Sequence, residues 1–204
     1  MLHGVVDMIR TYNNVLDEHL IKNVMDYFKS IMGADVWGSS IGWDQNLSLI
    51  SSNTLTHRIS NKSLEKEIKS NIETALDVDF EKEELTFVPS IYVWGGGSYI
   101  TWHPDECYPY NGTIYLNEEW DSDDGGVFLY KDSQTNEIKG IEPTYNSMVV
   151  NSATEADPHN THCVTCIVPG TIKKRVTIQW RTSDFDAPHG ISVIDKPHKN
   201  ISYQ

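Results

Sequence analysis

The pattern of apolar and polar residues divides the chain into a helical first third and a β-rich remainder. Two segments repeat apolar residues at helical spacing: residues 17–31, with Leu20, Val24, Tyr27, Phe28 and Ile31, and residues 63–76, with Leu64, Ile68, Ile72 and Leu76. Asp17 is suited to cap the first helix and Gly33 to end it, because each residue type favours that terminus. We therefore predict two amphipathic helices.

From residue 85 onward, the pattern changes to short apolar runs separated by turn residues, which is typical of strands. The predicted strands are residues 86–94, 98–102, 112–116, 126–130, 137–141, 147–151, 162–168 and 174–181. This order predicts a single, mainly β domain with N-terminal helices and a double-stranded β-helix core, a jelly-roll or cupin-like architecture with a mouth for a ligand. We expect a helical support region (1–84), the core (85–183) and an irregular tail (184–204).

The segment between the two predicted helices, residues 36–60, has two interpretations. It is rich in Ser, Asn and Gly and contains Trp37 and Trp43. A connection of this length is often functional. The segment is equally consistent with one or two outer strands, and the sequence leaves both interpretations open.

Composition narrows the class of protein. The 204 residues suit one domain, and 16 Lys and Arg against 29 Asp and Glu give a formal net charge of −13. Such a charge disfavours a nucleic-acid partner, because nucleic-acid affinity comes largely from Lys and Arg at phosphates. We expect no membrane span and no signal peptide, since no apolar run is long enough. Three Cys, an odd number, favour the reducing cytoplasm over a disulfide framework.

The triplet His103-Pro104-Asp105 is a candidate for two ligands of a metal ion. Two residues apart on extended backbone, the His103 and Asp105 side chains leave the same face of a strand. Pro104 also restricts His103 to an extended conformation. The third ligand must come from another part of the chain.

His159 and His162 are the two candidates for that third ligand. His159 lies in a polar stretch that is typical of a loop, whereas His162 opens an alternating run in which His162, Val164, Cys166 and Val168 share one face. A strand holds a ligand more rigidly than a loop does, so we predict His162. Cys163 and Cys166 point to opposite faces of the same run, and we interpret them as packing residues rather than a CxxC site.

Two imidazoles and one carboxylate leave half of an octahedral coordination sphere open, which is typical of non-heme Fe(II) oxygenases. A structural zinc site would close all its positions, commonly with thiolates. Downstream, alternation places Arg175, Thr177 and Gln179 on one face of a strand. This polar face could meet solvent, or it could line an interior where Arg175 needs an anion such as a dicarboxylate.

Residues 112–130, with Tyr115-Leu-Asn-Glu-Glu-Trp120 running into Gly125-Gly126, follow the His103 triplet. Over residues 88–180 the chain resembles the prolyl 4-hydroxylase branch of the Fe(II)/2-oxoglutarate dioxygenases. On the polar face of the strand, the Thr177 hydroxyl can add a hydrogen bond to a dicarboxylate at Arg175. The resemblance implies that Tyr115 joins Arg175 at the distal carboxylate of 2-oxoglutarate and that Tyr92 reaches the other end. The chain departs from the family in the 13-residue spacing from His162 to Arg175, where about ten is usual, which implies a longer turn at residues 169–171.

The resemblance further implies hydroxylation of a prolyl residue in a peptide or protein, with Fe(II), 2-oxoglutarate, O2 and ascorbate as cofactors and succinate and CO2 as co-products. Aromatic residues close to the triplet in sequence are candidates to line a substrate groove: Tyr99, Trp102, Tyr108, Tyr110 and Trp120. A free amino acid, a small metabolite or another protein residue remains open as the substrate, because one fold hosts many substrates. A non-catalytic jelly-roll binding or assembly module is the alternative from a different class.

Overall fold

The computed structural model describes residues 9–39, 54–105, 108–132, 134–151 and 161–184. Its elements are β1 (Ile9–Asn13), α1 (Glu18–Ile31), β2 (Gly38–Ser39), β3 (Leu55–Arg58), α3 (Lys62–Leu76), β4 (Leu85–Trp94), β5 (Ile100–His103), β6 (Asn111–Tyr115), the 3-10 helix η2 (Ser122–Asp124), β7 (Phe128–Lys131), β8 (Ile138–Ile141), β9 (Ser147–Asn151), β10 (His162–Val164) and β11 (Arg175–Asp184).

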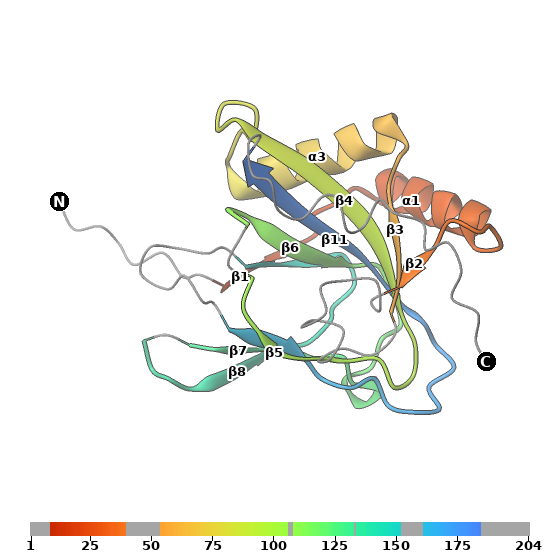
Figure 1. Ribbon diagram of the computed structural model, residues 1–204, viewed down its shortest axis with the longest axis vertical. Coiled ribbons are helices and arrows are strands. Elements are labelled where there is room, and N and C mark those ends of the chain that lie inside the picture. The colour runs from red at the N-terminus through yellow and green to blue at the C-terminus, as the bar shows by residue number, and fades with distance from the viewer. Residues whose placement is uncertain (1–8, 40–53, 106–107, 133, 152–160, 185–204) are drawn as a thin grey trace.

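The described strands form two antiparallel sheets, as the predicted mainly β, double-stranded β-helix fold requires. The large sheet has the order β1-β9-β6-β11-β4-β3-β2, and the small sheet has the order β5-β10-β7-β8. In Figure 1 the two helices lie against one side of the large sheet, and the small sheet lies on the other side. The large sheet is therefore the middle layer: one of its faces packs against the helices, and the other faces the small sheet.

Both predicted helices are confirmed. The Asp17 side chain accepts a hydrogen bond of 2.8 Å from the backbone N–H of Leu20, which caps α1. Asn61 caps α3 in the same way, and Asp77 ends α3 with a left-handed backbone. The apolar stripes of the helices pack against the large sheet in one cluster, which includes Leu20, Val24, Ile68, Ile72, Ile91, Ile178 and Trp180. This packing holds the two helices against β4 and β11 of the large sheet.

Within residues 36–60 the structure has the outer strands β2 and β3, which is one of the two interpretations that the sequence leaves open; residues 40–53, with Trp43, lie outside the described part. Two other features of the strands differ from the prediction. Strand β1, which the apolar pattern does not predict, pairs with β9. Residues 165–168 do not continue β10: Ile167 is buried and Val168 is exposed, so the predicted alternation through Cys166 and Val168 is wrong.

The cause of the last difference is local hydrogen bonding. The Ile167 N–H donates to the Ser98 carbonyl, and the Ile167 carbonyl accepts from Gly97, so the backbone leaves the ladder of β10. Cys163 is buried, Cys166 is exposed, and both are free thiols. Within the described ranges, no helix is long and apolar enough to cross a membrane. The tail at 185–204 lies outside the described residues.

Candidate active site

A cavity of about 240 Å³ lies between the two sheets. Alternation along β11 decides which side chains face it. Arg175 and Gln179 line the cavity, and Thr177 is buried on the same strand face between them. The intervening residues of β11 pack in the apolar cluster under the helices. The polar face of β11, for which the sequence leaves both solvent and an interior open, therefore lines the interior.

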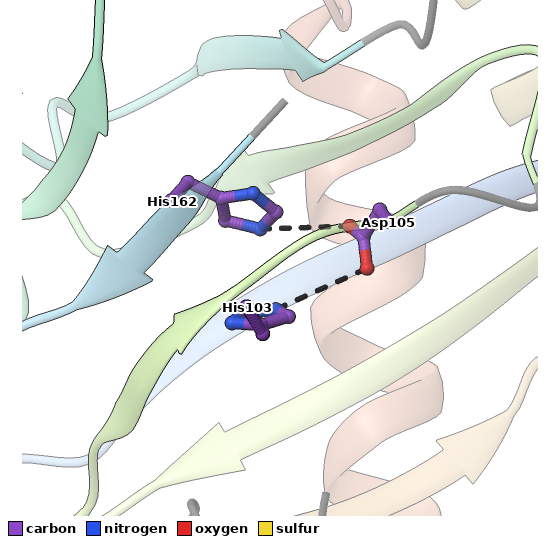
Figure 2. Close-up of side chains that lie close together, drawn as sticks. All are labelled: His103, Asp105 and His162. Atoms are coloured by element: carbon purple, nitrogen blue, oxygen red, sulfur yellow. Dashed lines mark ion pairs between the residues drawn. The ribbon is translucent and has the colours of Figure 1, made fainter. Parts of the chain in front are cut away.

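Figure 2 shows His103, Asp105 and His162 close together. All three line the cavity, and the two histidines lie on strands of the small sheet. His103 on β5 and His162 on β10 are direct cross-strand partners, and their ring centroids are 4.3 Å apart. Asp105 follows two residues after His103. One of its carboxylate oxygens, Oδ1, lies 3.9 Å from Nε2 of His103, and the other, Oδ2, lies 3.5 Å from Nε2 of His162. One ligand atom from each residue lies within 4.8 Å of the others.

The hydrogen bonding of His103 suits metal binding. Its Nδ1 lies 2.8 Å from the Thr101 carbonyl and donates to it, which leaves Nε2 with a free lone pair toward Asp105. Burial lowers the pKa of His103, and the neighbouring His162 lowers that pKa further, while Asp105 opposes the shift. The neutral imidazole is the form that ligates a metal. This donor set fits a divalent cation such as Fe(II).

Asn151, at the end of β9 in the large sheet, contacts the second histidine. Its amide nitrogen is 3.1 Å from Nδ1 of His162, and its Oδ1 is buried without a partner in the described residues. The two ends of an amide are exchanged by a 180° rotation. In that orientation Oδ1 accepts the Nδ1 proton of His162, and the lone pair of Nε2 is directed toward Asp105, where a metal would bind. The Phe128 ring stacks on the His162 ring, with 5.0 Å between the ring centroids.

Asn151→Ala is expected to weaken metal binding by about 10- to 100-fold, because His162 loses the acceptor that fixes its tautomer and its orientation. Asn151→Asp keeps an acceptor oxygen at the same place and should retain most of the affinity. Titration calorimetry with the metal measures the metal affinity of both variants. Equal affinities for the Ala variant and the unmodified protein would exclude this role for Asn151.

Arg175 lies at the opposite wall of the cavity from the histidines, at the start of β11. Only 2% of its surface is exposed, and its guanidinium lies over the rings of Trp94 at 4.7 Å and Tyr115 at 5.7 Å. Asn117 holds the backbone on both sides of Arg175, since it accepts from Val176 N–H at 2.7 Å and donates to the Lys174 carbonyl at 2.8 Å. The strand therefore presents the guanidinium in one direction.

The charge on Arg175 is only partly satisfied. One of its terminal nitrogens, Nη1, donates to the Gly126 carbonyl, but Nε is buried and has no partner among the described residues, and the same holds for the Thr177 hydroxyl. Burial lowers the pKa of Arg175 to about 10, so the side chain is still charged at neutral pH. A buried, charged group with free donors calls for an anion. A carboxylate fits these donors, which are the ones predicted to hold 2-oxoglutarate.

Tyr92 and Tyr115 also line this part of the cavity, and both are buried. Burial raises the pKa of Tyr115 against the opposing effect of Arg175. It also raises the pKa of Tyr92. Both phenols are therefore neutral donors at neutral pH. The structure thus brings together the four residues predicted for the co-substrate: Arg175, Tyr115, Thr177 and Tyr92.

Gly126→Ala is expected to disturb the arginine directly. Gly126 has a positive φ of 73°, and a Cβ built there would lie 2.5 Å from Nη1 of Arg175. We expect a loss of about 1–3 kcal/mol in the free energy of unfolding and weaker 2-oxoglutarate binding. Thermal unfolding with and without 2-oxoglutarate measures both effects. Gly33→Ala, where a Cβ meets nothing within 4 Å, is the control and should change neither.

Several other predictions can be compared with the structure. His159 lies outside the described residues. Of the five aromatic residues proposed for a groove, Tyr108 lines the cavity. Tyr110 and Trp120 pack against core clusters. Tyr99 and Trp102 are exposed.

Five polar residues of the cavity wall are not among the predicted site residues: Asn111, Thr113, Asn151, Gln179 and Arg181. The alternation that starts at Arg175 continues to Arg181 inside the predicted strand 174–181, so this residue could have been found by following the polar face to the end of that strand. Asn111 and Asn151 carry no such signal, because Asn is typical of turns.

Comparison with known proteins agrees with this geometry. Residues 89–181 match the 2OG-Fe(II) oxygenase superfamily. The predicted resemblance to the Fe(II)/2-oxoglutarate dioxygenases is confirmed over these residues. A comparison with curated protein sequences finds no match.

Solved structures of prolyl hydroxylases share the fold. A Pseudomonas putida prolyl-4-hydroxylase is 14% identical, with a TM-score of 0.64, over 88% of this chain and 94% of that one. A Trichoplax adhaerens prolyl hydroxylase, solved with a hypoxia inducible factor peptide fragment, is 16% identical, with a TM-score of 0.66, over 88% and 84%. A viral collagen prolyl hydroxylase from Paramecium Bursaria Chlorella virus-1 is 10% identical, with a TM-score of 0.59, over 89% and 99%.

Proposed function

We propose that this protein is a 2-oxoglutarate-dependent oxygenase that hydroxylates prolyl residues in a peptide or protein. The observation that carries the proposal is the cavity itself. His103, Asp105 and His162 lie at one wall, and a buried, incompletely paired Arg175 lies at the other. A metal ligand set and an anion site that share one enclosed space are what the chemistry of 2-oxoglutarate requires.

In this proposal each wall has its own task. His103, Asp105 and His162 hold Fe(II), which when bound supplies the oxidising power by activating O2 together with 2-oxoglutarate. Arg175, Tyr115 and Thr177 bind the distal carboxylate of 2-oxoglutarate, and Tyr92 contacts its other end. The burial of both walls keeps bulk water from the reacting groups. Succinate and CO2 are the co-products.

The prolyl substrate is supported by the fold shared with prolyl hydroxylases, one of them solved with a peptide. The predicted ascorbate requirement is part of the same proposal, as is a reducing compartment, which accords with the free thiols Cys163 and Cys166. Omitting ascorbate from the assay tests the ascorbate requirement.

The test is incubation of the protein with Fe(II), 2-oxoglutarate and O2 and a panel of proline-containing peptides. We expect a product that is heavier by one oxygen atom on proline, formed together with succinate. Labelled O2 should place its oxygen in the product. Succinate formation without any modified peptide would direct the search to other substrates, and hydroxylation of another residue type would contradict the prolyl assignment.

A further inference from the structure

A second arginine lines the end of the cavity far from Arg175. Arg181 lies on the same face of β11 as Arg175, six residues further along, which corresponds to about 20 Å of extended strand. Its cross-strand partner is Asn111 on β6, and the partner of Asn111 on β9 is Asn151. These three residues form one row across the large sheet. The row ends at His162, which Asn151 contacts.

Arg181 and Asn111 both have unused capacity to bind a ligand. The guanidinium of Arg181 is 5.2 Å from the ring centroid of Tyr108, and among the described residues no carboxylate forms an ion pair with it. Asn111 is 3% exposed, and its Nδ2 has no hydrogen-bond partner in the same part of the chain. A buried amide donor beside an unpaired cation is costly unless a ligand completes it.

The charge of Arg181 acts on the interior of the cavity. It lowers the pKa of Tyr92 against the larger effect of burial, while Asp105 raises that pKa. Arg181 and the carboxylate of Asp105 are therefore both within electrostatic range of the same cavity residue.

The two arginines are separate anion sites. Between them, Gln179 on β11 and Thr113 on β6 are cross-strand partners that satisfy each other through a hydrogen bond of 2.5 Å. This neutral pair offers no charge to a ligand. If Arg175 takes 2-oxoglutarate, as in the proposed function, Arg181 is left for a different molecule. Arg175 and Arg181 are the cationic side chains that line the cavity within the described residues.

We infer that Arg181 and the Asn111 amide bind a carboxylate of the molecule that is hydroxylated. The inference rests on the proposed function and narrows its substrate class. A single guanidinium with one amide donor suits a monoanion, and the fork of an arginine matches a carboxylate. That carboxylate belongs either to a free imino or amino acid or to an acidic residue next to the target in a peptide.

Direct binding to the protein loaded with Zn(II) and saturating 2-oxoglutarate tests the inference without turnover. Two matched probe pairs are used: L-proline against L-prolinamide, and a capped Gly-Pro-Glu peptide against its Gly-Pro-Gln counterpart. We expect the carboxylate member of one pair to bind roughly 10- to 100-fold more tightly than its amide. A preference within the first pair identifies a free acid, and a preference within the second identifies an acidic peptide. Equal binding within both pairs, or no binding of either carboxylate, overturns the inference.

Variants then assign the preference to Arg181. Arg181→Gln should lose the preference for the carboxylate probe over its amide, while its affinity for 2-oxoglutarate stays unchanged. Arg181→Lys should keep part of that preference. Lys29→Gln removes an exposed cation on α1 and is the control for net charge. A carboxylate preference that persists in a folded Arg181→Gln protein overturns the inference. If the preference depends on Arg181 but no succinate is formed under assay conditions, the proposed oxygenase function fails and this binding site stands.

Discussion

His162→Ala is expected to abolish iron binding and to reduce succinate formation to background. His162 is buried, faces its cross-strand partner His103, and lies 3.5 Å from the Asp105 carboxylate. Alanine leaves two ligands, which come from one short segment. Because loss of a residue that merely orients a ligand costs about 10- to 100-fold in affinity, loss of the ligand itself should cost at least about 100-fold.

Anaerobic Fe(II) titration measures the effect, and His159→Ala is the matched comparison, since it removes the rival histidine three positions earlier in the chain. The His159 variant should bind iron within a few-fold of the unmodified protein. Thermal unfolding of both variants without metal separates ligand loss from misfolding. If His159→Ala loses the iron and His162→Ala retains it, our assignment of the third ligand is wrong.

Arg175→Met should raise the 2-oxoglutarate concentration needed for turnover by about 100-fold, while iron binding in the absence of 2-oxoglutarate stays unchanged. Methionine is apolar and flexible enough to fill the space under Trp94 and Tyr115, but it provides no donor to a carboxylate. A bidentate, charge-assisted pair in a buried site is lost, and each such hydrogen bond is worth about 1.5–3 kcal/mol. Saturating 2-oxoglutarate should restore much of the rate.

Thermal unfolding measures the loss of 2-oxoglutarate binding in a second, independent way. A ligand at a hundred times its Kd stabilises a protein by about 2.7 kcal/mol, so 2-oxoglutarate should raise the Tm of the unmodified protein clearly. The same concentration should leave the Tm of Arg175→Met nearly unchanged. Arg175→Lys, which keeps the charge and loses the fork, should fall between them. An unaltered 2-oxoglutarate requirement in the Met variant would place the co-substrate elsewhere.

Periodicity predicted the parts of the fold that have a buried face. The stripes of α1 and α3, and the alternation of β11, are visible in the sequence because burial on one side requires them. Strand β1 was missed because its residues are half-buried or exposed and its stability comes from backbone pairing with β9. Strand β10 was predicted too long because an apolar run does not reveal that Ile167 bonds to Ser98 instead.

The site shows the same division between local and non-local information. The spacing of His103 and Asp105 is a local property of extended backbone, and it predicted a shared face. Whether the polar face of β11 meets solvent or a cavity depends on the small sheet, which covers it from elsewhere in the chain. Asn151 is likewise recognisable only once β9 is placed beside β10's histidine. Such contacts between sheets have no sequence pattern.

The central claim is that the two walls of this one cavity act together on iron and 2-oxoglutarate. The most direct measurement is anaerobic addition of one equivalent of Fe(II) and excess 2-oxoglutarate, followed by admission of O2 and quantification of succinate. Our account predicts succinate that requires iron, 2-oxoglutarate and O2 together and disappears in the His162→Ala protein. Succinate that forms equally without iron, or no succinate with any substrate of the panel, would contradict it.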